Sequence, residues 1–177
     1  MQLSAVDALA HLVESYLNTN SNELNRIYSR EGLRMWGEFK SRLHDESLEE
    51  ADYEMLLHAS MIGGMAITYT GTSLPHGLSY PVTYELGVPH GKAVGMFLGG
   101  YVAYYEDRQE SAEVLRLLGF ADAKEFGCYL RDLLGEVEVS EELMRADVKS
   151  ILDNPAKLKN YPFSISESQL FKMANYI

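Results

Sequence analysis

The chain has 177 residues, and its 26 acidic and 15 basic side chains give a formal net charge of −11. Its 46% of hydrophobic and 23% of charged residues are typical of a folded globular chain and argue against disorder. The acidic balance argues against nucleic acid or an anionic membrane as a partner, because both bind basic surfaces. Cys128 is the only cysteine, which excludes an internal disulfide and a thiolate metal cage and favours a cytoplasmic location. We expect neither a signal peptide nor a membrane-spanning segment.

Hydrophobic residues recur with a helical period along almost the whole chain, and no segment shows sustained alternation. The first helix is expected to begin near Ser4, a suitable N-cap. Later helices are expected over 24–43, 48–69, two segments of 75–105 separated near residues 85–87, 111–118, 121–134 and 140–152. A last helix should begin at Ser166, whose spacing to Gln169 is that of a capping box. The sequence therefore predicts an all-α chain, with residues 1–177 forming a single domain.

Three features of these helices predict packing. The Gly63-Gly64 pair costs about 1 kcal/mol per glycine in helix propensity, so another helix should pack close to it. His58 lies among apolar neighbours and should occupy the core or its boundary, whereas His44 should lie at a solvated helix end. Seven methionine and aromatic side chains are expected to pack in the core: Met61, Met65, Met96, Phe97, Tyr101, Tyr104 and Tyr105.

The most unusual pattern is the tripeptide Pro-His-Gly, which occurs at residues 75–77 and again at 89–91. A helix followed by a return turn would bring His76 and His90 to the same point. Asp7 and His11 are four residues apart and share one face of a helix. One carboxylate and three imidazoles suit Fe(II) or Zn(II), so these residues indicate a mononuclear metal site. Taken singly, each pattern also has an ordinary structural explanation. The spacing of Asp7 and His11 arises by chance on helix faces, and a histidine followed by glycine often marks a turn or a helix cap.

Two segments around these histidines resemble those of a known family. Residues 6–16 (VDALAHLVESY) are similar to the segment that carries the first two metal ligands of iron-containing (group III) alcohol dehydrogenases. Residues 74–81 and 87–93 resemble the family's second signature, with the same fourteen-residue interval between its histidines. Residues 55–66, and residues 159–162 followed by a capped helix, are also typical, so the resemblance covers nearly the whole chain. It implies the helical half of the dehydroquinate synthase-like fold, a multi-helix orthogonal bundle.

The resemblance also implies a function. In that family Asp7, His11, His76 and His90 would be the ligands of Fe(II) or Zn(II), which polarises the substrate oxygen during NAD(P)-dependent hydride transfer between an alcohol and an aldehyde or ketone. The nicotinamide cofactor would bind an amino-terminal α/β domain. This chain has no visible nucleotide-binding motif, so it should be inactive alone. The expected partners are therefore a small alcohol or aldehyde, that missing domain and a second copy in a homodimer.

One position departs from the family pattern. Many members carry a further histidine where this chain has Tyr80, and a phenol is a weaker base than an imidazole near neutral pH. Tyr80 is therefore the candidate proton relay. Two alternatives stay open: a metal-free relative similar to the maleylacetate reductases, and a non-catalytic helical fragment or interaction module. The alcohol, the choice of iron or zinc and the choice of NAD or NADP are not readable from the sequence.

Overall fold

The structure, a computed structural model, describes residues 1–176, and this part of the chain contains helices and no strand. The all-α prediction is therefore confirmed. The elements in chain order are α1 (Gln2–Tyr16), α2 (Glu23–His44), α3 (Glu50–Thr70), α4 (Leu74–Leu86), α5 (His90–Tyr104), α6 (Arg108–Leu118), α7 (Ala123–Leu134), α8 (Glu141–Leu152), α9 (Pro155–Leu158) and α10 (Glu167–Ala174).

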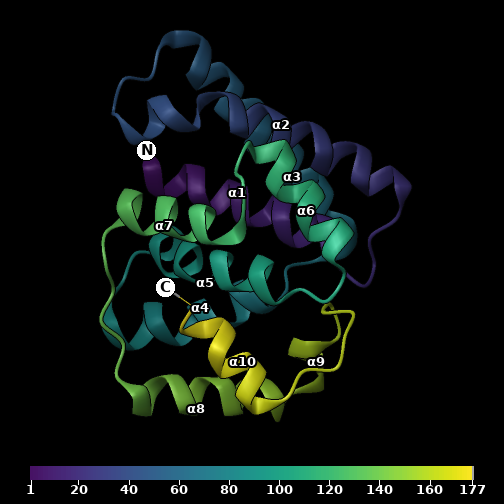
Figure 1. Ribbon diagram of the computed structural model, residues 1–177, viewed down its shortest axis with the longest axis vertical. Coiled ribbons are helices and arrows are strands. Elements are labelled where there is room, and N and C mark those ends of the chain that lie inside the picture. The colour runs from purple at the N-terminus through teal and green to yellow at the C-terminus, as the bar shows by residue number, and fades with distance from the viewer. Residues whose placement is uncertain (177) are drawn as a thin grey trace.

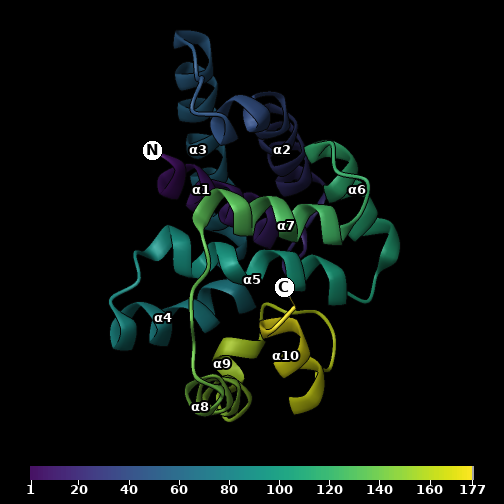
Figure 2. The ribbon, with the colours of Figure 1, turned by 60° about the vertical axis from the view of Figure 1, so that its left-hand side comes forward.

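Helix α1 lies in the middle of the bundle. Together with α5 and α7 it forms a central layer, with α2, α3 and α6 on one side and α4, α8, α9 and α10 on the other (Figure 1). Turning the molecule shows α8 end-on while α5 and α7 run across the view, so helices cross at steep angles (Figure 2). From Ala5 to Tyr16, every residue of α1 is buried except Asp7 and His11. The one partly open stripe on the central helix is thus the Asp-His pair.

The helix boundaries follow local capping chemistry. Asn22 accepts hydrogen bonds from the first amides of α2, and Ser166 and Gln169 form the expected capping box of α10. The expected N-cap at Ser4 is wrong, because the amide of Ala5 already bonds to the carbonyl of Met1 and Ser4 lies inside α1. The four-residue helix α9 was not expected from the hydrophobic pattern.

Helix α3 differs most from the sequence expectation. Met61 and Met65 are exposed rather than buried, and so is His58. The reason is that α3 packs one face against α1 and α2 and turns these side chains away from them. Gly63 does lie against α1, where an added Cβ would be 3.3 Å from the carbonyl oxygen of Ala8, but Gly64 faces open space. By contrast, the aromatic residues of α5 are largely buried as expected.

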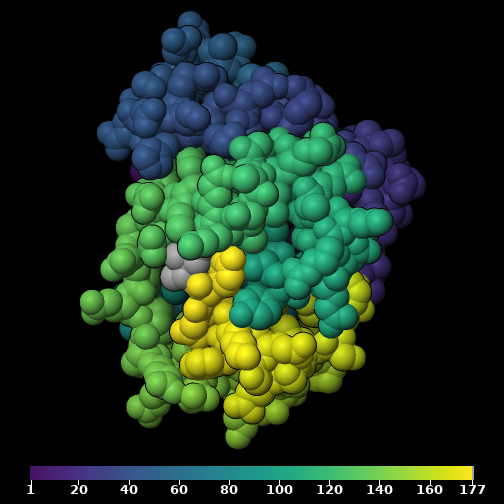
Figure 3. Space-filling model, in the orientation of Figure 1, coloured from purple at the N-terminus to yellow at the C-terminus, as the bar shows by residue number. Residues whose placement is uncertain are grey.

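The carboxy-terminal segment supports the far side of the central layer. Helix α10 packs on α5 and α8, and this yellow segment occupies the lower part of the surface shown in Figure 3. Just before it, Asn160 donates a hydrogen bond from Nδ2 to the carbonyl of Thr72 (2.7 Å) and accepts one from Asn20 (3.2 Å). These bonds tie down the loop that leads into α4. No helix within residues 1–176 combines the length and apolar character needed to cross a membrane.

Candidate metal centre

Three helices supply the predicted site residues. Asp7 and His11 project from α1, while His76 and His90 lie in the first turns of α4 and α5. Gly87 ends α4 in the left-handed conformation (φ 66°), which an L side chain rarely adopts, and residues 87–89 lead directly into α5. The result is that the rings of His76 and His90 lie edge to face with their centroids 5.2 Å apart.

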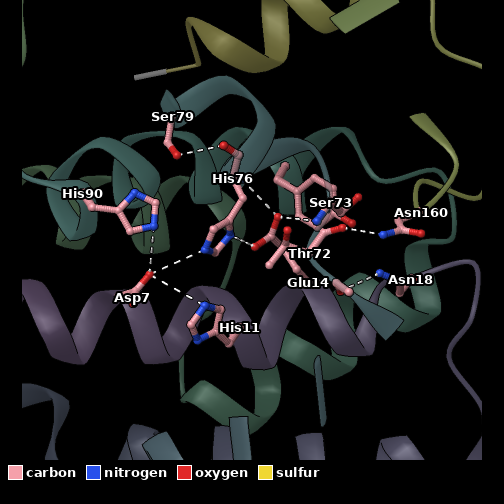
Figure 4. A network of polar contacts seen from close by, with 12 residues as sticks. Asp7, His11, Glu14, Asn18, Thr72, Ser73, His76, Ser79, His90 and Asn160 are labelled. Atoms are coloured by element: carbon pink, nitrogen blue, oxygen red, sulfur yellow. Dashed lines mark hydrogen bonds and ion pairs between the residues drawn. The ribbon is translucent and has the colours of Figure 1, made fainter. Parts of the chain in front are cut away.

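Asp7 is the point on which the histidines converge. Its Oδ1 lies 3.5 Å from Nε2 of His76 and 3.5 Å from Nε2 of His90 (Figure 4). One donor atom from each of these three residues lies within 4.8 Å of the other two. Oδ1 of Asp7 and Nε2 of His76 are both buried and have no hydrogen-bond partner among the described residues, since 3.5 Å is long for a good hydrogen bond. Two buried ligand atoms that lack hydrogen-bond partners fit a site that binds a cation.

His11 adjoins this cluster without joining it. Its Nε2 lies 3.8 Å from Oδ1 of Asp7, and its ring stacks on that of His76 with centroids 5.0 Å apart and planes 15° apart. The structure thus brings together Asp7, His76 and His90 and places His11 at their edge.

The charges of the cluster depend on one another. Burial alone would raise the pKa of Asp7, but the nearby imidazoles of His76, His11 and His90 lower it overall. Burial lowers the pKa of His11, which favours its neutral form. Burial also lowers the pKa of His76, but the carboxylates of Glu14 and Asp7 outweigh burial and raise this pKa to about 9. Asp7 therefore remains a carboxylate, the form that binds cations.

Glu14 was not identified from the sequence, although it contacts His76 directly. It is fully buried, and Oε2 accepts a hydrogen bond from Nδ1 of His76. The signal was present, because Asp7, His11 and Glu14 are spaced four and then three residues apart and share one stripe of α1. On this spacing alone, Glu14 could have been included among the candidate site residues.

Tyr80 lies at the open side of the cluster. Its ring is parallel to that of His90 within 3°, with centroids 6.1 Å apart, and 53% of the residue remains exposed. One turn later on α4, Tyr84 is almost entirely exposed. The phenol of Tyr80 therefore lies beside the partly exposed ring of His90, on the solvent side of the cluster.

Comparison with known proteins identifies the family. The model of the C-terminal part of the Fe-containing alcohol dehydrogenase family matches residues 2–160. The chain belongs to the Fe-containing alcohol dehydrogenase family. An iron-containing alcohol dehydrogenase structure from Thermotoga maritima is similar to it with a TM-score of 0.84 and 31% identity, covering 99% of this chain and 48% of that one.

Two further relatives show the range of chemistry among similar proteins. The 4-hydroxybutyrate dehydrogenase of Clostridium kluyveri is 27% identical over 91% of this chain and 49% of its own length. A sulfoacetaldehyde reductase from Bifidobacterium kashiwanohense, solved in complex with NAD+, has a TM-score of 0.77 and 25% identity over 99% of this chain and 50% of its own. The chain spans about half the length of these relatives, all of which are oxidoreductases by name.

Proposed function

We propose that this chain is the metal- and substrate-binding half of an NAD(P)-dependent alcohol dehydrogenase. In this proposal Asp7, His11, His76 and His90 hold Fe(II) or Zn(II). The observation that carries it is the convergence of Asp7, His76 and His90, with two of their buried donor atoms left unpartnered within residues 1–176. Family membership supports the reaction class.

When bound, the metal would act as a Lewis acid that polarises the alcohol or carbonyl oxygen during hydride transfer. The protein's own contribution is a donor set with one carboxylate and three imidazoles, which leaves a divalent cation with net positive charge. In this proposal Tyr80 passes a proton between the bound substrate and solvent, which is supported by its half-exposed position beside His90.

An apolar ridge on α3 supports the idea that a second domain completes the enzyme. Tyr53, Leu57, Met61, Met65 and Tyr69 follow one another at intervals of four residues and are all exposed. The opposite side of α3 touches the centre, since an added Cβ on Gly63 would be 3.5 Å from Cβ of His11. We propose that the α/β nucleotide-binding domain covers this ridge, because the relatives are about twice as long.

Metal analysis of purified variants tests the ligand set. His76→Ala and His90→Ala should each lose most of the metal bound by the wild-type chain, because each removes one of the converging donors. His44→Ala is the matched control, since His44 is exposed and bonds only to its neighbour Asp45 among the described residues. A His76→Ala or His90→Ala variant with full metal occupancy would contradict the assignment.

Metal removal separates this proposal from a metal-free relative. Activity of the full-length enzyme should disappear after exhaustive chelation and return when Fe(II) or Zn(II) is added. Activity that survives chelation would instead favour a reaction that uses the same fold without a metal.

A further inference from the structure

The buried environment of Glu14 points to a role in the site. Its side chain is fully enclosed by protein, where an unpaired carboxylate would be strongly unfavourable. The structure gives it three donors. Oε1 accepts the backbone amides of Ser73 (2.8 Å) and His76 (3.2 Å), and Oε2 accepts Nδ1–H of His76 (Figure 4).

The two backbone bonds make Glu14 the cap of a helix in another part of the chain. Ser73 precedes α4, but its own hydroxyl makes no capping bond within the described part of the chain. The carboxylate of Glu14 takes that place from α1, where it also faces the positive end of the α4 dipole. These two bonds orient the carboxylate, so that Oε2 is directed at the imidazole of His76.

The third bond determines how His76 faces the centre. A carboxylate can only accept, so Nδ1 of His76 must carry a proton and its other nitrogen, Nε2, points at Asp7. A histidine ligand needs an unprotonated nitrogen directed at the cation, and a carboxylate on the opposite nitrogen fixes that arrangement. We infer that Glu14 is a positioning residue, which holds His76 with Nε2 available to the metal; this inference rests on the proposed metal site.

Glutamine at position 14 provides a sharp test, because it cannot satisfy all three donors. With its oxygen on the amides of Ser73 and His76, its NH2 group opposes Nδ1–H of His76 and favours the wrong tautomer. With the amide reversed, the NH2 group opposes the two backbone N–H groups. Either way the histidine or its helix loses a partner, while side-chain volume stays the same.

The experiment is Zn(II) titration against a chelating dye for the wild type, Glu14→Gln, His76→Ala and the double variant. Glu14→Gln should weaken Zn(II) binding by about 10- to 100-fold, the usual effect of losing such a partner. In the His76→Ala background the same change should have almost no further effect, because Glu14 acts through His76. Asp147→Asn is the matched control: it also converts a buried carboxylate into an amide, on α8, and should bind Zn(II) as the wild type does.

A second measurement does not depend on metal. In the metal-free chain, ¹⁵N-edited NMR should show a slowly exchanging Nδ1–H of His76 that is absent in Glu14→Gln. Loss of that signal with loss of Zn(II) affinity supports the inference. Wild-type-like affinity in Glu14→Gln, or equal weakening in the His76→Ala background, overturns it. If the wild type shows the Nδ1–H signal but binds no Zn(II), the proposed metal site fails while the hydrogen-bonding role of Glu14 stands.

Discussion

At the scale of single residues, two buried carboxylates meet opposite environments. Glu14 is enclosed but has three hydrogen-bond donors, whereas Asp147 on α8 is 3% exposed and neither of its oxygens has a partner among residues 1–176. Burial accordingly raises the pKa of Asp147 to about 7, against a smaller opposing effect of Lys157. Lys157 forms no ion pair with Asp147 among the described residues, and its Nζ bonds instead to the hydroxyl of Ser150 (3.4 Å).

This environment predicts a pH-dependent stability. The folded state binds the proton of Asp147 more tightly than the unfolded state does, so ionisation between about pH 4 and pH 7 lowers the free energy of unfolding. Asp147→Asn removes that ionisation. The variant should match the wild type near pH 4 and exceed its unfolding free energy at pH 8 by up to about 4 kcal/mol, the equivalent of a three-unit shift. Urea unfolding at both pH values measures this, and a difference independent of pH would contradict it.

At the scale of elements, two glycines show where helices touch. Gly91 follows His90 in the first turn of α5, where a Cβ would lie 2.0 Å from the carbonyl oxygen of Leu3 in α1. Gly64 in α3 has no atom within 4 Å of that position. Both glycines weaken helix propensity equally, yet only Gly91 is required for a close approach between backbones.

Alanine substitutions should therefore have opposite effects. Gly91→Ala forces α5 away from α1 and should cost about 3 kcal/mol of unfolding free energy, while also moving His90 from the centre. Gly64→Ala meets open space and should add about 0.5–1 kcal/mol through helix propensity. Denaturant unfolding of the two variants under the same conditions compares them. Equal effects would show that propensity, not the contact with α1, accounts for both.

At the scale of the whole molecule, the proposed reaction needs more than these residues. The 177 residues include the candidate metal ligands but none of the glycine-rich motifs that bind a dinucleotide. The chain also spans about half the length of its relatives. The homodimer also stays a prediction, since the exposed ridge on α3 is assigned to the nucleotide-binding domain.

The 177-residue chain should therefore show no turnover with alcohols and NAD+ or NADP+, even when fully loaded with Fe(II) or Zn(II). Absorbance of the reduced nicotinamide at saturating cofactor measures this, with a full-length relative as the positive control. Robust turnover by the chain alone would mean that the helical half binds the nucleotide itself.

The sequence alone determined the features that depend on local chemistry. Helical period, the capping box of Ser166 and Gln169 and the spacing of Asp7 to His11 are set by neighbours within one or two turns, although the N-cap expected at Ser4 was wrong. The repeated Pro-His-Gly indicated the two other histidines of the cluster. Family resemblance extended these features to a fold, which the structure confirms. The reason is that such patterns need only the geometry of a helix.

Only the tertiary structure decided which contacts form between residues far apart in the sequence. Glu14 meets Ser73 and His76 across 59 and 62 residues of sequence, and no local pattern specifies that contact. The exposure of Met61 and the burial of Asp147 likewise depend on which face of each helix its neighbours cover. Packing of α1, α4 and α5 therefore turns a set of suitable residues into a site of defined geometry.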